Sequence, residues 1–226
     1  MKKTLFVFFL FLFAGKLSGQ DTIVIITDSD TLSYQEIEYQ PFRIGLNIGG
    51  GYRFGKSYET GNSGFDHLAD GTKIGFIFGA EATYFFFNNL GLGLRYNYFG
   101  YSNNEESNTL NFKTSYIGPS LYGRIKLGNP NMFLVPSVGA GYMRERQSST
   151  YDSQSIDIKG NTIGMMASVS FDFKISNGAI ISIEAAYMGG SLSKWKEKNG
   201  GNFTLPDNQK EGLSRIDLKI GIKLLP

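Results

Sequence analysis

Apolar and polar residues alternate along much of this chain, and the segment Phe42–Phe54 shows the pattern first. Its large apolar residues stand at every second position, and the residues between them are glycine, asparagine or arginine. Successive side chains of a β-strand point to opposite faces, so the pattern predicts a strand that separates two different environments. The segment is also longer than a typical globular strand of about 5–6 residues.

The alternation returns seven times downstream and so predicts eight strands, at about residues 42–54, 73–86, 90–98, 110–127, 132–142, 163–175, 181–187 and 215–224. The connections alternate between long and short, and the long ones are the polar segments 55–71, 102–109, 144–161 and 189–212. Long loops on one side and short turns on the other are typical of outer-membrane barrels. We therefore predict an all-β fold, a closed antiparallel eight-stranded up-and-down transmembrane β-barrel over residues 42–226.

The short turns set the register between neighbouring strands. A three-residue turn at 87–89 would pair Phe86 with Leu90 and would place Glu81 opposite Arg95. Residues directly opposite each other in an antiparallel pair share a face of the sheet. We therefore expect Glu81 and Arg95 to meet on the inner face.

The fourth predicted strand is irregular. Three apolar residues of its first half fall in the opposite phase to its second half: Leu110, Phe112 and Tyr116. One inserted residue reverses the facing of everything after it, so we predict a β-bulge near 115–119. Pro119 and Pro136 lack the N–H that a strand ladder needs, and we expect each to mark a bulge. Misplaced strand limits are the alternative.

The first residues are typical of an export signal. Residues 1–3 are basic, residues 4–14 form an apolar stretch too short to span a membrane, and small residues follow. We expect a signal peptide at 1–19 and a periplasmic extension at 20–41, with an uncleaved anchor as the alternative. Without residues 1–19 the basic residues fall from 22 to 19 against 20 acidic ones, so the charge does not favour nucleic acid. An even strand number places both termini in the periplasm.

Three features resemble the small outer-membrane barrel families, namely the OmpA/OmpX-like barrels and the PorT-type outer membrane protein beta-barrel domain. They are the segments 116–121 (YIGPSL) and 136–142 (PSVGAGY) and the alternating last strand. The resemblance covers about residues 42–226. It implies an outer-membrane location in a Gram-negative bacterium and assembly by the barrel-assembly machinery, with no catalytic residue carried over. The chain ends in Leu224-Leu225-Pro226, whereas these families usually end the last strand with an aromatic residue.

The two faces of the predicted strands give two sets of candidate residues. Buried charges need partners, and an eight-stranded barrel has an interior that side chains just fill, so we predict a packed polar lumen. The predicted lumen charge network is Arg43, Arg53, Glu81, Arg95, Arg124, Asp172, Glu184, Arg215, Asp217 and Lys219.

Aromatic rings settle at the membrane surfaces. The predicted aromatic girdle is Tyr52, Tyr84, Phe86, Tyr98, Tyr142, Phe171, Phe173 and Tyr187.

Candidate chemistry is sparse. The chain has no cysteine, which excludes thiolate metal sites and thiol catalysis, and we expect no metal and no cofactor. Residues 50–57 (GGYRFGKS) match the sequence pattern of a phosphate-binding loop. That loop needs a buried parallel strand before it and a helix after it, whereas an alternating strand precedes these residues.

His67, the only histidine, could act with Ser57 or Ser63 in a lipid-modifying enzyme at the barrel rim. A solvated loop histidine is the plainer interpretation.

The sequence therefore favours a non-enzymatic outer-membrane barrel that displays surface loops for envelope structure, adhesion or binding. Its expected partners are outer-membrane lipid, the assembly machinery and a possible extracellular ligand, and the longest loop, 189–212, is the best contact surface. A narrow porin-like channel is the main alternative. A soluble ligand-binding barrel would need an apolar interior and a polar exterior, the inverse of the predicted facing.

Overall fold

The computed structural model describes residues 41–57, 73–105, 108–151, 154–197, 200–205 and 210–225. The predicted signal peptide, the predicted periplasmic extension apart from Pro41, and His67 lie outside these residues. All regular structure in the described part of the chain is β-strand. No helix within these ranges is long and apolar enough to cross a membrane, a finding that concerns helices alone.

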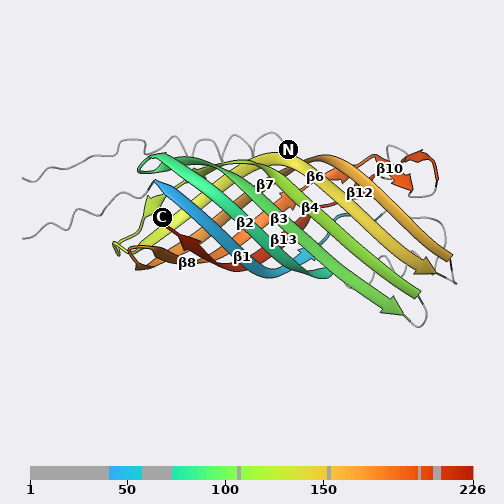
Figure 1. The fold of residues 1–226 in the computed structure, drawn as a ribbon, viewed down its shortest axis with the longest axis horizontal. Helices are drawn as coiled ribbons and strands as arrows, with labels where there is room; N and C mark the ends of the chain where they lie inside the picture. The colour runs from blue at the N-terminus through green and yellow to red at the C-terminus, as the bar shows by residue number, and fades with distance from the viewer. Residues whose placement is uncertain are drawn as a thin grey trace, which may run out of the picture. The chain divides into compact units, whose positions relative to one another are not determined.

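Eight long strands form one antiparallel ring (Figure 1). They are β1 (Phe42–Arg53), β2 (Ile74–Phe87), β3 (Leu90–Glu105), β4 (Asn108–Gly123), β6 (Met132–Tyr151), β7 (Gln154–Ser176), β8 (Ala179–Gly189) and β13 (Arg215–Leu224). Neighbours in the chain pair around the ring, and β13 pairs with β1 to complete it, with Ile44 opposite Leu224 and Arg53 opposite Arg215. The predicted eight-stranded antiparallel fold is confirmed.

Five short strands accompany the ring. They are β5 (Ile125–Lys126), β9 (Ser191–Leu192), β10 (Lys194–Glu197), β11 (Asn202–Thr204) and β12 (Glu211–Gly212). β10 pairs with β7 and β11, and β9 pairs with β12. Four of the five lie in 189–212, so the prediction of one long loop there is wrong. Backbone pairing gives this segment a defined structure at the end of the ring.

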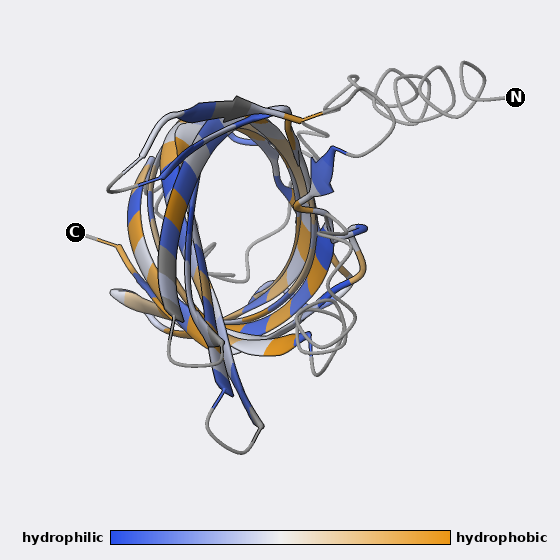
Figure 2. Cartoon of the chain, turned by 90° about the vertical axis from the view of Figure 1, so that its right-hand side faces the viewer, coloured by the Kyte–Doolittle hydropathy of each residue, from blue (hydrophilic) through white to orange (hydrophobic). Residues whose placement is uncertain are grey.

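The strand faces follow the alternation of the sequence, and Figure 2 shows the ring end-on with hydrophobic and hydrophilic residues alternating along each strand. On β1 the aliphatic side chains of Leu46 and Ile48 are about half exposed, whereas Arg43 and Arg53 are buried in the interior. The same holds on β13, where Leu218 is 64 % exposed and Lys219 is 1 % exposed. A continuous apolar outer face of this kind requires a lipid or protein partner.

The strands continue beyond the predicted limits, and there the polarity of the two faces is reversed. β3 and β4 run through most of the predicted loop 102–109, and β6 and β7 run through nearly all of 144–161. In these extensions Phe112 points inward and is buried, whereas Lys113 points outward and is exposed. The two polar loops predicted there are therefore wrong. The reversed facing is the pattern expected of a barrel strand that passes from lipid into water on its outer side.

This reversal replaces the predicted bulge near 115–119. The pairing of β3 with β4 has one uninterrupted register from Leu90–Gly123 to Glu105–Asn108. The register between β4 and β6 is also the same on both sides of Pro119, since Ile117 lies opposite Tyr142 and Ser120 opposite Gly139. The phase change is therefore a change of solvent along a regular strand.

The two prolines also lie in regular register. Pro119 lies opposite Leu94 of β3, and Pro136 lies opposite Val169 of β7. The pairing with β4 and β5 is interrupted opposite Pro136, which has no N–H to donate, but the register is the same on both sides, since Tyr122 lies opposite Ser137 and Ile125 opposite Leu134. The predicted bulges at the prolines are wrong, and a bulge occurs instead at the turn after β2. Phe87 pairs with Leu90, so the predicted pairing of Phe86 with Leu90 is also wrong.

The chain enters and leaves the ring at the end that carries the short turns. The backbone carbonyl of Pro41 accepts a hydrogen bond from Phe85, just before the turn after β2. At the other terminus, the N–H of Leu225 donates to Gly178 in the turn between β7 and β8. We call this the turn end, and the opposite end, with the long extensions of β6 and β7, the loop end.

Candidate functional site

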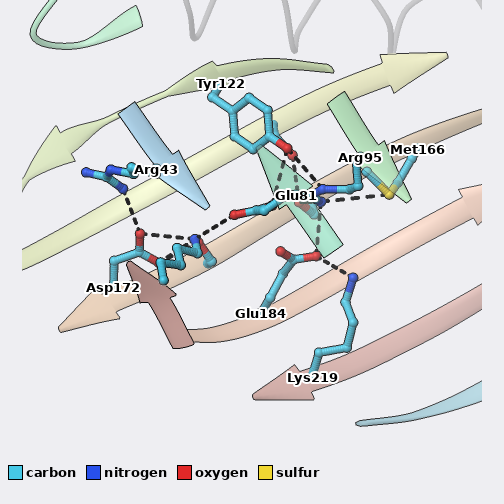
Figure 3. Close-up of polar contacts among 12 residues, drawn as sticks. Arg43, Glu81, Arg95, Tyr122, Met166, Asp172, Glu184 and Lys219 are labelled. Carbon is cyan, nitrogen blue, oxygen red and sulfur yellow. Dashed lines mark hydrogen bonds and ion pairs between the residues drawn. The ribbon is translucent and has the colours of Figure 1, made fainter. Parts of the chain in front are cut away.

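A network of charged side chains crosses the middle of the lumen (Figure 3). Glu81 on β2 and Arg95 on β3 lie directly opposite, as the register predicts, and Arg95 Nη2 is 2.5 Å from Glu81 Oε2. Arg95 Nη1 is 3.1 Å from Glu184 Oε1 on β8, and the same oxygen lies 2.6 Å from Lys219 Nζ on β13. These contacts join four strands through the interior of the ring.

Lys223 extends the network toward the turn end. Its Nζ lies 3.3 Å from Glu81 Oε1 and 3.0 Å from Asp172 Oδ1. Arg43 Nη1 donates to Asp172 Oδ2 at 3.0 Å. Lys223 is absent from the predicted network, although it lies on the same face of β13 as Lys219. The uninterrupted alternation of the last strand was the signal that could have identified it.

The network is deeply buried and satisfied by opposite charges. Glu81 is the most exposed of its seven members, at 5 %. The Tyr122 hydroxyl donates to Glu81 Oε2 at 3.2 Å and accepts from Arg95 Nε at 3.1 Å. Removing one partner of such a buried pair typically costs about 3–5 kcal/mol, because the other charge is left uncompensated. Each member of the network therefore depends on its oppositely charged neighbours to remain buried.

Two inward glycines make room for these side chains. A Cβ added at Gly45 would lie 2.9 Å from Glu81 Cγ, and one added at Gly51 would lie 2.8 Å from Asp217 Oδ1. Real Cβ atoms do not approach other heavy atoms so closely. Glycine at these positions thus lets two long strands carry bulky charged residues into a narrow interior.

Apolar side chains fill the lumen on both sides of the network. Toward the turn end, Phe85, Tyr122 and Val135 form one buried cluster. Toward the loop end a larger cluster contains Ile77, Phe99, Tyr101, Phe112, Tyr116, Met143, Met166, Met188, Leu192 and Leu213. The prediction of a polar lumen is therefore only partly correct, because the middle charge network lies between two apolar clusters.

Four predicted members of the charge network lie elsewhere along the barrel axis, namely Arg53, Arg124, Arg215 and Asp217. Arg215 Nε is 3.0 Å from Asp217 Oδ1, and these two residues form a pair nearer the loop end. Arg124 lies at the turn end, where its Nε donates to the Asn88 carbonyl at 2.8 Å and its guanidinium lies 4.3 Å above the Phe85 ring. Alternation fixes the face of a residue but does not fix its neighbours along the axis.

The loop end of the lumen holds a second cluster of charges. Arg53, a predicted network member, instead forms an ion pair with Glu211 of β12 and donates to the Tyr101 hydroxyl at 3.1 Å. Trp195 Nε1 donates to Glu145 Oε2 at 3.4 Å, and Glu145 is 1 % exposed. Burial, reinforced by the Glu211 carboxylate, raises the pKa of Glu145 to about 8 against the opposing effect of Arg53. Glu145 is absent from the predicted network because residues 144–161 were predicted to form a loop.

The predicted girdle residues point outward at two levels. Tyr52, Tyr142 and Tyr187 are about half exposed where the apolar outer face ends toward the loop end. Tyr84 and Phe171 are likewise exposed near the turn end. The remaining three, Phe86, Tyr98 and Phe173, lie on the same outer face, with Phe86 exposed and the other two half-buried.

The other chemical candidates gain no support. Residues 50–53 of the phosphate-loop match belong to β1, with the Tyr52 ring pointing outward and Arg53 buried inside. Across the described ranges, no group of three or more histidine, cysteine, aspartate or glutamate side chains is placed to hold a metal ion. His67 and Ser63 lie outside the described residues, so the rim-enzyme hypothesis stays untested.

Comparison with known proteins identifies the fold. No protein-family model and no curated protein sequence matches this chain. Among solved structures, the chain is similar to Neisserial surface protein A at 16 % identity, with a TM-score of 0.52 over 82 % of this chain and 97 % of that one. It is also similar to the outer membrane protein OprG from Pseudomonas aeruginosa at 12 % identity, with a TM-score of 0.50 over 83 % of this chain and 97 % of that one. These likenesses show a fold shared with outer-membrane β-barrel proteins.

Proposed function

We propose that this protein is a non-enzymatic outer-membrane barrel that conducts no steady current and works through the surface of its loop end. The observation that supports the plugged lumen most directly is the buried network from Arg43 to Lys219. Its members meet across the ring, and clusters of buried apolar side chains lie on both sides of it along the axis. The exposed apolar band on the outside supports a location in a lipid bilayer.

We propose the orientation from the two ends of the ring. The turn end has short connections and carries both termini of the ring, as expected for the periplasmic side of an exported barrel. The loop end carries the extensions of β6 and β7 and the short strands β9–β12. These paired extensions would form the extracellular surface. They make a structured platform for envelope contacts or for binding an external ligand.

Planar-bilayer recording tests the plugged lumen. The refolded full chain should insert without steady channel openings, whereas a variant with Arg95, Tyr122 and Glu184 all replaced by alanine should conduct. That variant removes side chains from three strands of the middle layer and serves as the positive control for insertion. Steady unit conductance from the unaltered protein would establish the narrow channel and overturn the proposal.

Cysteine labelling tests the orientation, since the chain has no cysteine of its own. Lys196→Cys, on the exposed face of β10, should react with a membrane-impermeant maleimide on intact cells. Asn177→Cys, in the turn between β7 and β8, should react only after the outer membrane is opened. The reverse pattern would place the loop end in the periplasm, and labelling of neither in the outer-membrane fraction would exclude that location.

A further inference from the structure

The outer wall of three neighbouring strands changes abruptly from apolar to basic at the loop end. Ile117 of β4, Tyr142 of β6 and Ile163 of β7 lie side by side in one row of the sheet, and all three are exposed. They are the last large apolar residues on the outer faces of these strands before the extensions. Two residues further along each strand, the row contains Arg144 of β6.

Four residues beyond the apolar row, the outer wall is cationic on all three strands. Lys113 lies directly opposite Arg146, and Arg146 lies directly opposite Lys159. The row continues on β10, where Lys196 lies opposite Lys159. Like charges directly opposite each other destabilise a strand pair. An anion bound among these side chains would offset that repulsion, because each basic group would then contact an opposite charge.

The basic rows line a hollow of about 380 Å³ on this wall. Its charged lining residues are Lys113, Arg144, Arg146, Lys159 and Asp157, which gives four positive charges against one negative and a formal charge of +3. Ser148 donates to Asp157 at 2.5 Å, and no salt bridge to the four basic residues is found among the described side chains. The basic groups therefore remain available for a ligand with several anionic oxygens.

The height of the hollow matches the headgroup layer of a membrane. Strands rise about 3.4 Å per residue, and barrel strands tilt by about 40°. Arg144 therefore lies about 5 Å above the last apolar row along the membrane normal, and the row of Lys113, Arg146 and Lys159 about 10 Å above it. Headgroups occupy about 5–8 Å on each side of the hydrocarbon core. Lysine and arginine side chains are long enough to bend back toward that layer.

We propose that this basic hollow binds the phosphate groups of a glycolipid in the outer leaflet. The proposal rests on the proposed outward orientation of the loop end. The basic residues of the hollow lie on the outer wall just beyond the exposed apolar row, so one amphiphile can place phosphates on the basic row and acyl chains against Ile117 and Ile163. Arginine favours such a site because its planar guanidinium can donate two hydrogen bonds to one phosphate. A soluble anion would use the basic row but not the apolar wall beneath it.

Lipid binding in detergent tests the proposal without a membrane. The full chain is refolded in neutral micelles, titrated with bis-phosphorylated lipid A or with its dephosphorylated form, and examined by native mass spectrometry. The variant Arg146→Gln/Lys159→Gln removes two charges from exposed positions of the row. The control Lys126→Gln/Lys174→Gln removes two charges at the turn end. Heat-modifiable gel migration verifies that both variants are folded.

The unaltered protein should bind the phosphorylated lipid at least about tenfold more tightly than the dephosphorylated one. The Arg146→Gln/Lys159→Gln variant should lose about 25-fold in affinity for the phosphorylated lipid, and the control should change by less than about twofold. Equal binding of the two lipids, or equal losses in the two variants, would overturn the proposal. Competition by glucosamine phosphate as strong as by the lipid would also overturn it, because a soluble sugar phosphate would then suffice.

Failure of this experiment is distinguishable from failure of the proposed function. The titration depends neither on the orientation in cells nor on the closure of the lumen. Channel currents or reversed cysteine labelling would refute the proposed function and leave an affinity for phosphorylated lipid intact. Loss of lipid binding alone would leave a plugged, outward-facing barrel.

Discussion

Glu145 gives the sharpest prediction, because the only tryptophan of the chain reports on it. Burial raises the pKa of this carboxyl from 4.5 to about 8, and the indole of Trp195 donates to it. The groups that face Glu145 are Arg53, Tyr101 and Glu211. Arginine stays charged throughout the range, and burial raises the pKa of Tyr101 above 10.0. We therefore expect Trp195 fluorescence to titrate with a midpoint near pH 8.

The raised pKa of Glu145 also predicts how the stability of the protein depends on pH. Between about pH 4.5 and pH 8 the folded cluster keeps a proton on Glu145 that the unfolded chain releases, so the free energy of unfolding falls as the pH rises through this window. The full shift in the pKa of Glu145 corresponds to a loss of about 5 kcal/mol in the free energy of unfolding across this window. Glu145→Gln removes the ionisable group and preserves the acceptor for Trp195. It should therefore be close to the unaltered protein in stability at pH 4 and more stable than it at pH 9.

The assay is a pH titration of tryptophan emission in neutral micelles, followed by urea unfolding at pH 4, 7 and 9. Glu197→Gln is the matched control, because Glu197 is a half-exposed acid on the same short strand as Trp195. The control should retain the fluorescence transition, and Glu145→Gln should lose it. A transition with a midpoint below pH 6, or one that persists in Glu145→Gln, would refute the burial of Glu145 against Trp195.

Three further predictions follow from the lumen and the extensions. Glu81→Gln should destabilise the barrel by about 3–5 kcal/mol in urea titrations, because Arg95 loses a buried counter-charge; a loss below about 1 kcal/mol would show that the network is not tightly packed. Gly51→Leu should prevent formation of the compact, heat-modifiable species, since even a Cβ would lie 2.8 Å from Asp217 Oδ1; normal gel migration would contradict the close approach. Replacing 147–158 with a two-residue turn should leave heat-modifiable migration intact, because the ring is paired below this segment; loss of the folded band would show that the extensions are needed for folding.

Much of the fold could be predicted from the sequence, because the two faces of a membrane-barrel strand meet different surroundings and therefore carry different residues. Along the apolar outer band, Leu218 and Lys219 point to opposite sides, and the period of two reveals both the strand and its facing. The facing and the short turn after β2 also predict that Glu81 lies opposite Arg95, as observed. The same reasoning failed in the extensions. There the inner face is apolar and the outer face is charged, so the inward Phe112 and the outward Lys113 suggested a shift in register that does not exist.

The sequence by itself therefore determined the number of ring strands, their order and the facing of residues along the apolar outer band, since these depend on local alternation and turn chemistry. Only the tertiary structure decided which charges meet, because a partner across the lumen depends on strand tilt and axial position, which alternation does not encode. The separation of Arg53 and Arg124 from the middle network shows this limit. The basic row on the outer wall of β4, β6 and β7 shows it as well, because its members are distant in the chain and become neighbours only through strand pairing.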